Sequence, residues 1–304
     1  MPPHNRLDAT AVTMMVVLCS LWALNHVAIK LAITGIPPVL QAGLRSLGGA
    51  VLVWIWSRLH GVKLFERKDP LGAGLVAGLL FAAEFLFVYW GLAFTTAARS
   101  VLLLYTAPFA VAVGAHLFVP GERLRPVQVA GLALAFLGVV LVFGDALRLP
   151  TRRELIGDAM VFVAAMLWGA TTVVIKATRL ATTHPNKTLL YQIGLSGIVL
   201  TAVAPLFGDM RVDATPVVLA SMVFQIVVIT FASYLAWFWL VTRYPASRLA
   251  AFTFLTPVIG VPAGALLLDE PVSWILLVAL VLVASGIYLV NRAQAVLPQP
   301  LEKR

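Results

Sequence analysis

The residues of this chain that could do chemistry are few, and they lie inside long apolar segments. Glu84 is the one acidic residue deep in such a segment, and Arg45 and His26 lie in two others. A carboxylate there could exchange a proton or bind an ammonium group, and a guanidinium could bind a carboxylate. Ionisable groups in apolar surroundings are costly, so they usually face a cavity or a partner. Glu84 and Arg45 are therefore candidates for a substrate site, or for a pair with each other.

Structural roles are the alternatives for these residues. Arg45 lies about six residues into its segment, roughly 9 Å at the helical rise, so its side chain could instead reach the helix end and bond carbonyl groups. Glu84 could be a protonated acid bonded to a neighbouring helix, and His26 a satisfied structural residue. No second histidine stands at metal-ligand spacing, and no convergent catalytic set or phosphate-binding loop appears. We expect no metal, no cofactor, no ATP use and no enzymatic activity.

Aromatic side chains accompany the charged candidates. Tyr234, Trp237 and Phe238 follow Thr230 at spacings of four, seven and eight, which places them on one helical face. The residues expected to line a cavity are Phe85, Tyr89, Tyr105, Trp168, Tyr191, Gln192, Tyr234, Trp237 and Phe238, with Glu84, His26 and Arg45. Such walls suit planar or apolar side chains and can hold an ammonium group by cation–π attraction. Helix packing and lipid contact are the alternatives.

The elements that must position these residues are membrane helices. Of 304 residues 61% are apolar and 12% charged, and the mean hydropathy is +0.96, against about half apolar and a quarter charged in soluble domains. At roughly 20 residues a span, this suffices for about nine or ten spans. Disorder, a disulfide scaffold and a soluble nucleic-acid binder are excluded. The net charge of +9 is typical of Lys and Arg in cytoplasmic loops, so the lipid bilayer, not nucleic acid, is the expected partner.

Apolar runs between charged, Pro and Gly residues predict ten spans. They are 11–31, 39–57, 71–94, 99–119, 126–144, 157–178, 188–207, 216–241, 247–268 and 272–291. Lys and Arg are more numerous in the loops on the side that holds both termini. The positive-inside rule then places both termini in the cytoplasm.

The two halves of the chain repeat each other at offsets of 146 to 149 residues. The matched positions are Leu21–Trp22 with Leu167–Trp168, Lys30 with Lys176, Arg99 with Arg248, Pro108 with Pro257 and Glu122 with Glu270. We predict two units, 11–144 and 157–291, of five spans each. Because five is odd, the second unit enters the membrane from the opposite side. Inverted repeats of this kind build secondary transporters, whose substrate site lies near the midplane.

Two sets of matched residues are candidates for moving parts. Pro108 and Pro257 free a backbone carbonyl inside the fourth and ninth spans and permit a bend, so they could be paired hinges or static kinks. Lys30 and Lys176 should lie at opposite membrane faces, as helix-end anchors or as charges beside a gate.

Several stretches resemble one known family. They are Leu21-Trp-Ala-Leu-Asn-His-Val-Ala-Ile-Lys30, Ala98-Arg-Ser-Val-Leu-Leu-Leu-Tyr-Thr-Ala-Pro108 with Gly121–Glu122–Arg123, and Ser247-Arg-Leu-Ala-Ala-Phe-Thr-Phe-Leu-Thr-Pro257 with Asp269–Glu270–Pro271. The chain resembles the EamA-type family of the drug/metabolite transporter superfamily over nearly all of 11–291. It departs from the family pattern at Ala23, where glycine is common.

The resemblance implies an all-α membrane protein of ten helices, in two inverted five-helix repeats around a central substrate cavity. It implies an exporter in the bacterial inner membrane, most similar to exporters of aromatic and other amino acids, that works by alternating access. A monomer is sufficient because each chain holds both repeats. Cationic drugs and nucleotide sugars are the alternative substrates. Facilitated efflux is expected, with proton antiport through Glu84 as the alternative.

Overall fold

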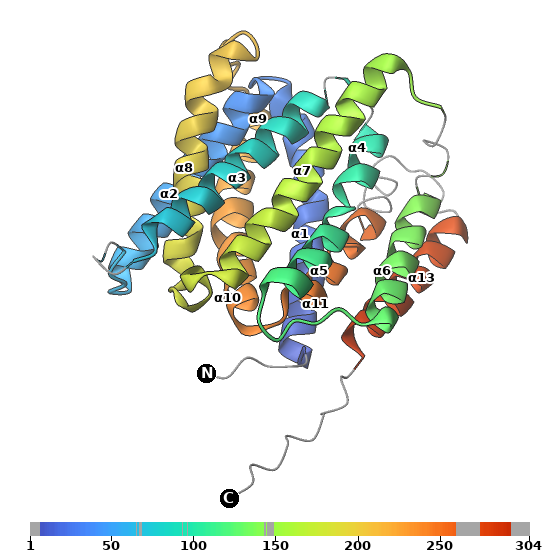
Figure 1. Cartoon of the computed structure of the whole chain (residues 1–304). Coiled ribbons are helices and arrows are strands. Elements are labelled where there is room, and N and C mark those ends of the chain that lie inside the picture. Colours follow the sequence, from blue (N-terminus) through green and yellow to red (C-terminus); the bar gives the residue numbers. More distant parts are fainter. Residues whose placement is uncertain are drawn as a thin grey trace, which may run out of the picture.

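The structure is a computed structural model of the chain. It describes residues 7–64, 66, 69–92, 94–95, 97–142, 144, 149–259 and 274–292. The side chains of His26 and Lys30 lie outside the described part, so their predicted roles stay predictions, and Glu270 lies outside it as well. The described residues form a bundle of helices without a strand, and the start of α1 and the end of α13 lie at the same end of the bundle, which we call the end that carries the termini (Figure 1).

The described part of the first half of the chain contains helices α1 to α6. They are α1 (Ala9–Ile33), α2 (Pro38–Leu59), α3 (Leu71–Gly91), α4 (Ala97–Leu104), α5 (Ala107–Phe118) and α6 (Pro126–Val142). The second half contains α7 (Arg152–Ala177), η2 (Arg179–Thr182), α8 (Pro185–Val203), η3 (Ala204–Leu206), α9 (Pro216–Val223), the π-helix η4 (Phe224–Ser233), α10 (Tyr234–Arg243), α11 (Ala246–Phe252) and α13 (Trp274–Asn291).

Local sequence signals determine where these helices begin. Asp8 caps α1, and its side chain accepts a hydrogen bond from the backbone N–H of Ala11. Thr151 and Glu154 form a reciprocal capping box at the start of α7. Four helices (α2, α6, α8 and α9) begin at a proline, whose missing N–H would have no partner in a first helical turn.

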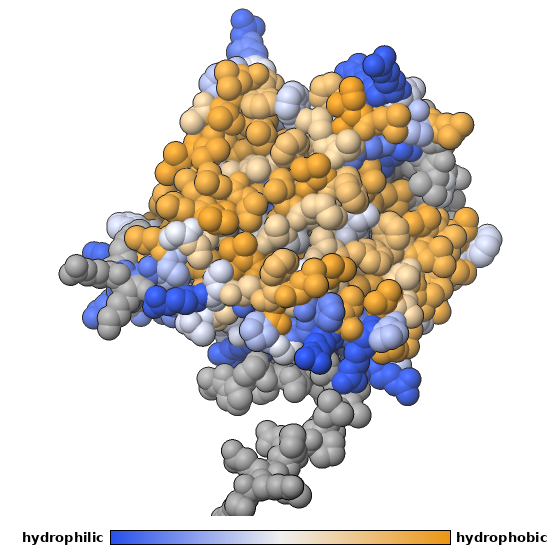
Figure 2. Space-filling model, in the orientation of Figure 1, coloured by the Kyte–Doolittle hydropathy of each residue, from blue (hydrophilic) through white to orange (hydrophobic). Residues whose placement is uncertain are grey.

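Seven helical segments are long and apolar enough to cross a bilayer, so this is a multi-pass membrane protein. They are Ala9–Ile33, Pro38–Leu59, Leu71–Gly91, Arg99–Phe118, Arg152–Ala177, Pro185–Leu206 and Pro216–Arg243. The predicted spans 126–144, 247–268 and 272–291 fall on shorter apolar helices, each adjoining residues outside the described part. The ten-span inverted topology thus stays a prediction. Figure 2 shows apolar side chains over the middle of the bundle and hydrophilic ones at its ends.

Glycines bring helices of the two halves into backbone contact. A Cβ on Gly286 of α13 would lie 2.4 Å from the carbonyl oxygen of Gly131 in α6, and these helices lie side by side in Figure 1. A Cβ on Gly43 of α2 would lie 2.7 Å from the backbone nitrogen of Thr201 in α8. Each contact joins a helix of the first half to one of the second, as small residues allow in membrane helices.

The fourth and ninth predicted spans are each interrupted just before their proline. Helix α4 ends in a turn at Tyr105–Thr106 before α5, which contains Pro108. Helix α11 ends in a turn at Thr253–Phe254, and residues 255–259, which contain Pro257, are helical again. The hydroxyl of Thr106 donates to the carbonyl of Leu103 at 2.6 Å. The matching bond in the second half comes from Thr253, to the carbonyl of Ala250 at 2.7 Å.

Candidate substrate-binding site

Arg45 is buried in the bundle and held by two aromatic side chains. Its exposed fraction is 1%. Its Nη2 donates a hydrogen bond to the hydroxyl of Tyr234 in α10 at 3.2 Å, and its Cζ lies 4.3 Å from the ring centroid of Phe85 in α3. The guanidinium therefore stays inside the bundle and does not extend to the end of α2. The alternative in which Arg45 bonds helix-end carbonyls is wrong for this structure, because aromatic partners are nearer.

Glu84 lies beside this arginine without a direct bond to it. Helix α3 places Glu84 and Tyr89 within electrostatic reach of Arg45. Yet Oε2 of Glu84, Nε of Arg45 and the hydroxyl of Tyr89 are all buried with no hydrogen-bond partner among the described residues. Buried polar atoms are normally satisfied, so each exception needs an explanation. These three atoms make this part of the bundle the candidate substrate-binding site.

Aromatic rings enclose these polar atoms. The ring centroids of Phe81 and Phe85 are 4.6 Å apart, and that of Tyr89 is 6.2 Å from Phe85. The ring of Phe81 also meets that of Tyr234 edge-to-face at 6.2 Å. We call Arg45, Glu84, Tyr89, Tyr234, Phe81 and Phe85 the central cluster. Helices α2 and α3 of the first half and α10 of the second build it.

A second aromatic group adjoins the central cluster along α10. Nε1 of Trp22 in α1 donates to the hydroxyl of Ser233 at 3.1 Å, and Trp22 meets Trp237 edge-to-face at 5.5 Å. Ser233 precedes Tyr234 in the chain, so the two groups share a boundary. The sequence indicated Trp237 but not Trp22, which had been used only to align the repeats. Trp22 lies about one helical turn before Asn25, a polar residue on the same apolar helix, and this position could have indicated it as a site residue.

Other predicted residues lie elsewhere. Tyr105 and Trp168 meet edge-to-face at 6.3 Å, as a pair separate from the central cluster's ring contacts. Phe238 is buried in the hydrophobic core, and Gln192 is buried with its Oε1 lacking a partner among the described residues. The hydroxyl of Tyr191 donates to Asp69 Oδ2 at 3.2 Å, in the loop before α3. This hydrogen bond directs the hydroxyl of Tyr191 to the loop, and its role as a cavity residue stays a prediction.

Lys176 is a helix-end anchor in this structure. Its Nζ donates to the carbonyls of Val241 at 3.0 Å and Tyr244 at 2.8 Å, and lies 3.5 Å from Oε1 of Glu122. The same carboxylate oxygen of Glu122 accepts from the backbone N–H of Ala246 at 3.0 Å. The end of α7, the link between α10 and α11, and the loop after α5 are thus joined at one point.

Comparison with known proteins agrees with this architecture. The model of the EamA-like transporter family matches residues 9–144 and again 155–292. The chain belongs to the EamA-like transporter family. Like the EamA transporters that it resembles, it is a transporter and not an enzyme.

Two relatives and one solved structure are similar to this EamA transporter. A "probable amino-acid metabolite efflux pump" of Escherichia coli is 30% identical over 94% of the chain and 95% of its own length. An "aromatic amino acid exporter" of Ancylobacter novellus is 31% identical over 46% of the chain and 47% of its own length. A solved crystal structure superimposes with a TM-score of 0.81 at 20% identity, covering 94% of the chain and 99% of its own, and supports the fold alone.

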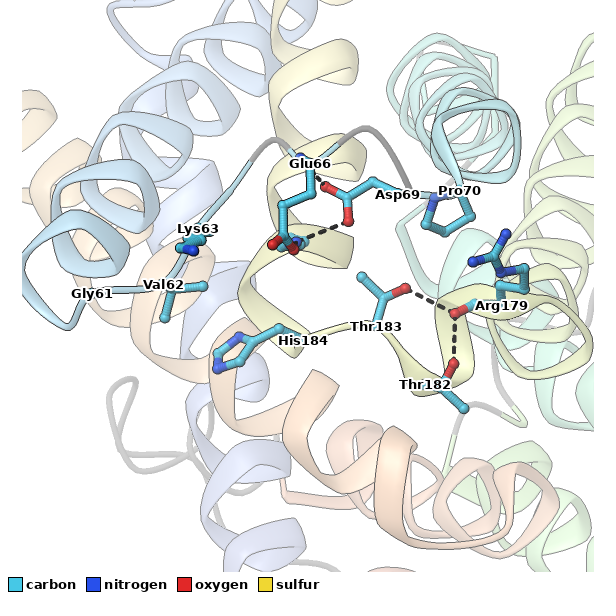
Figure 3. A pocket seen from close by; sticks show the side chains of 11 residues that line it. Gly61, Val62, Lys63, Glu66, Asp69, Pro70, Arg179, Thr182, Thr183 and His184 are labelled. Atoms are coloured by element: carbon cyan, nitrogen blue, oxygen red, sulfur yellow. Dashed lines mark hydrogen bonds and ion pairs between the residues drawn. The ribbon is translucent and has the colours of Figure 1, made fainter.

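At the end of the EamA bundle that carries the termini, charged residues line a polar cavity of about 490 Å³ (Figure 3). Nζ of Lys187 lies 2.6 Å from Glu66 Oε2 and 2.8 Å from Asp69 Oδ1. Burial opposes the ionisation of Asp69. Hydrogen bonds from Lys187 and from the backbone N–H of Glu66 outweigh it, and hold the pKa of the Asp69 carboxyl below its ordinary value. Sequence reasoning missed this network because its acids lie in a loop.

We expect Lys187→Met to lower the free energy of unfolding by about 1–3 kcal/mol at pH 7. This loss is smaller than that of breaking a fully enclosed ion pair, because the cavity admits water. The depressed pKa of Asp69 stabilises the fold above the ordinary carboxyl pKa of about 4, and this stabilisation is lost as the pH falls through the folded-state pKa. The difference between variant and parent should therefore shrink in acid. Thermal unfolding in detergent between pH 7 and pH 3 measures it. Asp209→Asn, in an exposed pair with Arg211, is the control, and a loss that persists unchanged in acid would contradict the assignment.

Proposed function

We propose that this transporter exports amino acids, aromatic and other neutral ones, with related small metabolites, across the bacterial inner membrane. The observation that carries the proposal is the set of unsatisfied polar atoms in the central cluster. Nε of Arg45 is an unused donor, and Oε2 of Glu84 is an unused acceptor. An amino-acid zwitterion has the complementary groups, because its carboxylate accepts from a guanidinium and its ammonium group donates to a carboxylate.

The surroundings of these atoms favour a bulky side chain. Phe85 and Tyr234 both contact Arg45, and the rings of Phe81 and Tyr89 pack against that of Phe85. Trp22 and Trp237 lie next along α10. Aromatic faces attract both an ammonium group and a planar ring. A zwitterion bound at Arg45 and Glu84 would direct its side chain along these rings, which supports aromatic and large neutral amino acids.

The transport cycle that fits this site is alternating access between two inverted five-helix repeats, 11–144 and 157–291, with both termini in the cytoplasm. The central cluster draws residues from both repeats, as expected for a site at their interface. One chain supplies the whole cluster, so a monomer is sufficient. Facilitated efflux, driven by the concentration gradient of the substrate, is the simplest mode of transport. In proton antiport, Glu84 is the group through which a proton would be exchanged.

Counterflow in proteoliposomes tests the proposal. Vesicles loaded with unlabelled phenylalanine, tryptophan, threonine or lysine are diluted into labelled amino acid, with and without a pH gradient. We expect uptake without a gradient, strongest for the aromatic amino acids. Uptake only with a gradient would replace facilitated efflux by proton coupling. No amino-acid flux, with flux of a cationic dye or a nucleotide sugar instead, would overturn the substrate class.

We expect Glu84→Gln to reduce phenylalanine counterflow by roughly 10- to 100-fold, the value of a hydrogen bond to a charged group. The reason is specific to the ammonium group. Inhibition of counterflow by 3-phenylpropionate, which has the ring and the carboxylate but no ammonium group, should therefore change little. Competition curves for the two compounds measure the difference. Asp213→Asn, at an exposed acid, is the control, and equal loss for both compounds would contradict the ammonium role.

A further inference from the structure

Asp158 in α7 is bound by two residues, Thr95, which precedes the fourth span, and Arg99, which begins it. Its Oδ1 accepts from the hydroxyl of Thr95 at 2.6 Å. Nε of Arg99 donates to Oδ1 at 3.3 Å and to Oδ2 at 3.1 Å, and Nη2 of Arg99 donates to Oδ2. The exposed fractions of the two charged side chains are 14% and 11%. A nearly enclosed, charge-assisted pair of this geometry is among the stronger polar contacts in proteins.

This contact joins the two repeats at the end of the bundle away from the termini. Thr95 and Arg99 belong to the first repeat and Asp158 to the second. Helix α4 and the start of α7 lie opposite the end that carries the termini (Figure 1). Beside Asp158, the backbones themselves meet. A Cβ on Gly157 would lie 2.7 Å from both the carbonyl oxygen of Gly91 and the backbone nitrogen of Thr95. The segment that contains Gly91 and Thr95 therefore packs directly against the backbone of α7 at Gly157.

The element that carries Arg99 is separate from the rest of its span. Helix α4 has eight residues and ends at the turn Tyr105–Thr106, just before Pro108. A segment with a break at one end and a loop at the other can rotate as a unit. Rotation of α4 about this break would withdraw Arg99 from Asp158 without disturbing α5.

A corresponding contact occurs at the other end of the bundle. The hydroxyl of Tyr244 donates to Asp8 Oδ2 at 3.0 Å. Tyr244 follows Thr95 by 149 residues, the offset of the repeat at this span. The offset of 146 at the first span pairs Asp158 with Val12, and Asp8 lies one helical turn before Val12. The longer side chain of tyrosine spans that extra turn. Each repeat thus presents a hydroxyl before its fourth span to an aspartate at the start of the other repeat's first helix.

We infer that Asp158, with Thr95 and Arg99, is the contact that closes the face away from the termini, and that Asp8 with Tyr244 is its counterpart at the opposite face. Each contact must break for its own face to open. The inference rests on the alternating access proposed above but not on the identity of the substrate. These are positioning residues, since they lie away from the central cluster and act on access to it.

Accessibility of the central cluster from one side of the membrane tests this inference. Cys19 is the only cysteine, so Cys19→Ala combined with Ser233→Cys gives one reporter thiol beside Tyr234. Intact cells are treated with a membrane-impermeant maleimide, and labelling is followed over time without added substrate. We expect Asp158→Asn to raise the labelling rate at least about tenfold, because it removes the ion pair. Gly157→Ala should act in the same direction by separating the backbones.

Control variants distinguish the loss of the closing contact from a general loosening of the helix packing. Asp209→Asn breaks an exposed ion pair in the loop after α8, and Gly194→Ala adds a methyl group where no atom lies within 4 Å; neither should change labelling. The exchange of Arg99→Asp with Asp158→Arg should restore slow labelling. Tyr244→Phe should raise labelling in inverted membranes and lower it in intact cells.

Two results would overturn the inference. Unchanged labelling in Asp158→Asn, with the protein monodisperse in detergent, would show that this contact does not limit opening. Labelling that stays fast in the charge exchange would show that loss of the pair itself was not the cause. Both readouts are made without substrate, so a wrong amino-acid assignment leaves them interpretable.

Discussion

Arg45→Gln is expected to abolish amino-acid counterflow within the sensitivity of the assay, a loss of about 30-fold or more. Removing one partner of a buried charged pair costs about 2–5 kcal/mol, and Arg45 is the proposed partner of the substrate carboxylate. Glutamine keeps a donor but loses the charge, the bond to Tyr234 and the contact over Phe85. Initial rates of phenylalanine counterflow, normalised to reconstituted protein, measure the effect.

Two further variants sharpen this result. Arg45→Lys keeps the charge but lacks the planar fork that donates to Tyr234 while lying over Phe85, so we expect partial loss. Arg58→Gln removes an exposed arginine from the far end of the same helix and should transport normally. If monodisperse Arg45→Gln protein transports at the full rate, Arg45 does not bind the substrate carboxylate. Glu84 would then be the main residue that binds the substrate.

Gly286→Leu is expected to lower the free energy of unfolding by about 3 kcal/mol or more. Any side chain at this position meets backbone, not a movable side chain, because a Cβ would lie 2.4 Å from the carbonyl oxygen of Gly131 and 2.6 Å from the nitrogen of Ala135. Helices α6 and α13 would have to separate. Overpacking costs about 1–3 kcal/mol for a few added methylenes, and leucine at a backbone contact should reach at least the upper end. Unfolding in a denaturing detergent measures the loss.

The control for this prediction is the same substitution at a glycine with free space. Gly194 in α8 has no neighbouring atom within 4 Å of a built Cβ. Gly194→Leu should therefore keep or slightly increase stability, since leucine is the better helix former. Similar destabilisation of both variants would mean that glycine itself, and not the α6–α13 contact, is required.

Composition and apolar runs were enough to predict an all-helical membrane protein. Apolar runs longer than a bilayer crossing predict membrane helices without reference to tertiary contacts, and seven of the predicted runs correspond to described helices that are long and apolar enough to cross a bilayer. The turns before Pro108 and Pro257 lie where proline prevents a continuous helix. Boundaries inside a span were beyond prediction. The π-helix Phe224–Ser233, which packs against α1 and α2, was not predicted from the apolar run that contains it.

The site was predictable in its charged residues and less so in its aromatic ones. Arg45 and Glu84 stand out because charge inside an apolar segment is costly. Aromatic residues carry no such cost, so their spacing alone cannot distinguish a cavity wall from a packed core. Phe81 and Phe238 show this, since both belong to the same buried hydrophobic cluster although Phe81 also contacts the rings of Phe85 and Tyr234. Trp22 was missed because it belongs to an ordinary apolar helix.

The π-helix has a mechanical consequence for the eighth span. It contains one more residue per hydrogen-bonded ring than an α-helix, and it ends at Ser233, directly before the Tyr234 that bonds Arg45. Moving that spare residue along the span would turn α10 about its axis by about one residue position, roughly 100° at 3.6 residues per turn. Tyr234 would leave Arg45 and a different side chain of α10 would face it. A shift of the π-helical turns along the eighth span would thus change which side chain of α10 faces Arg45.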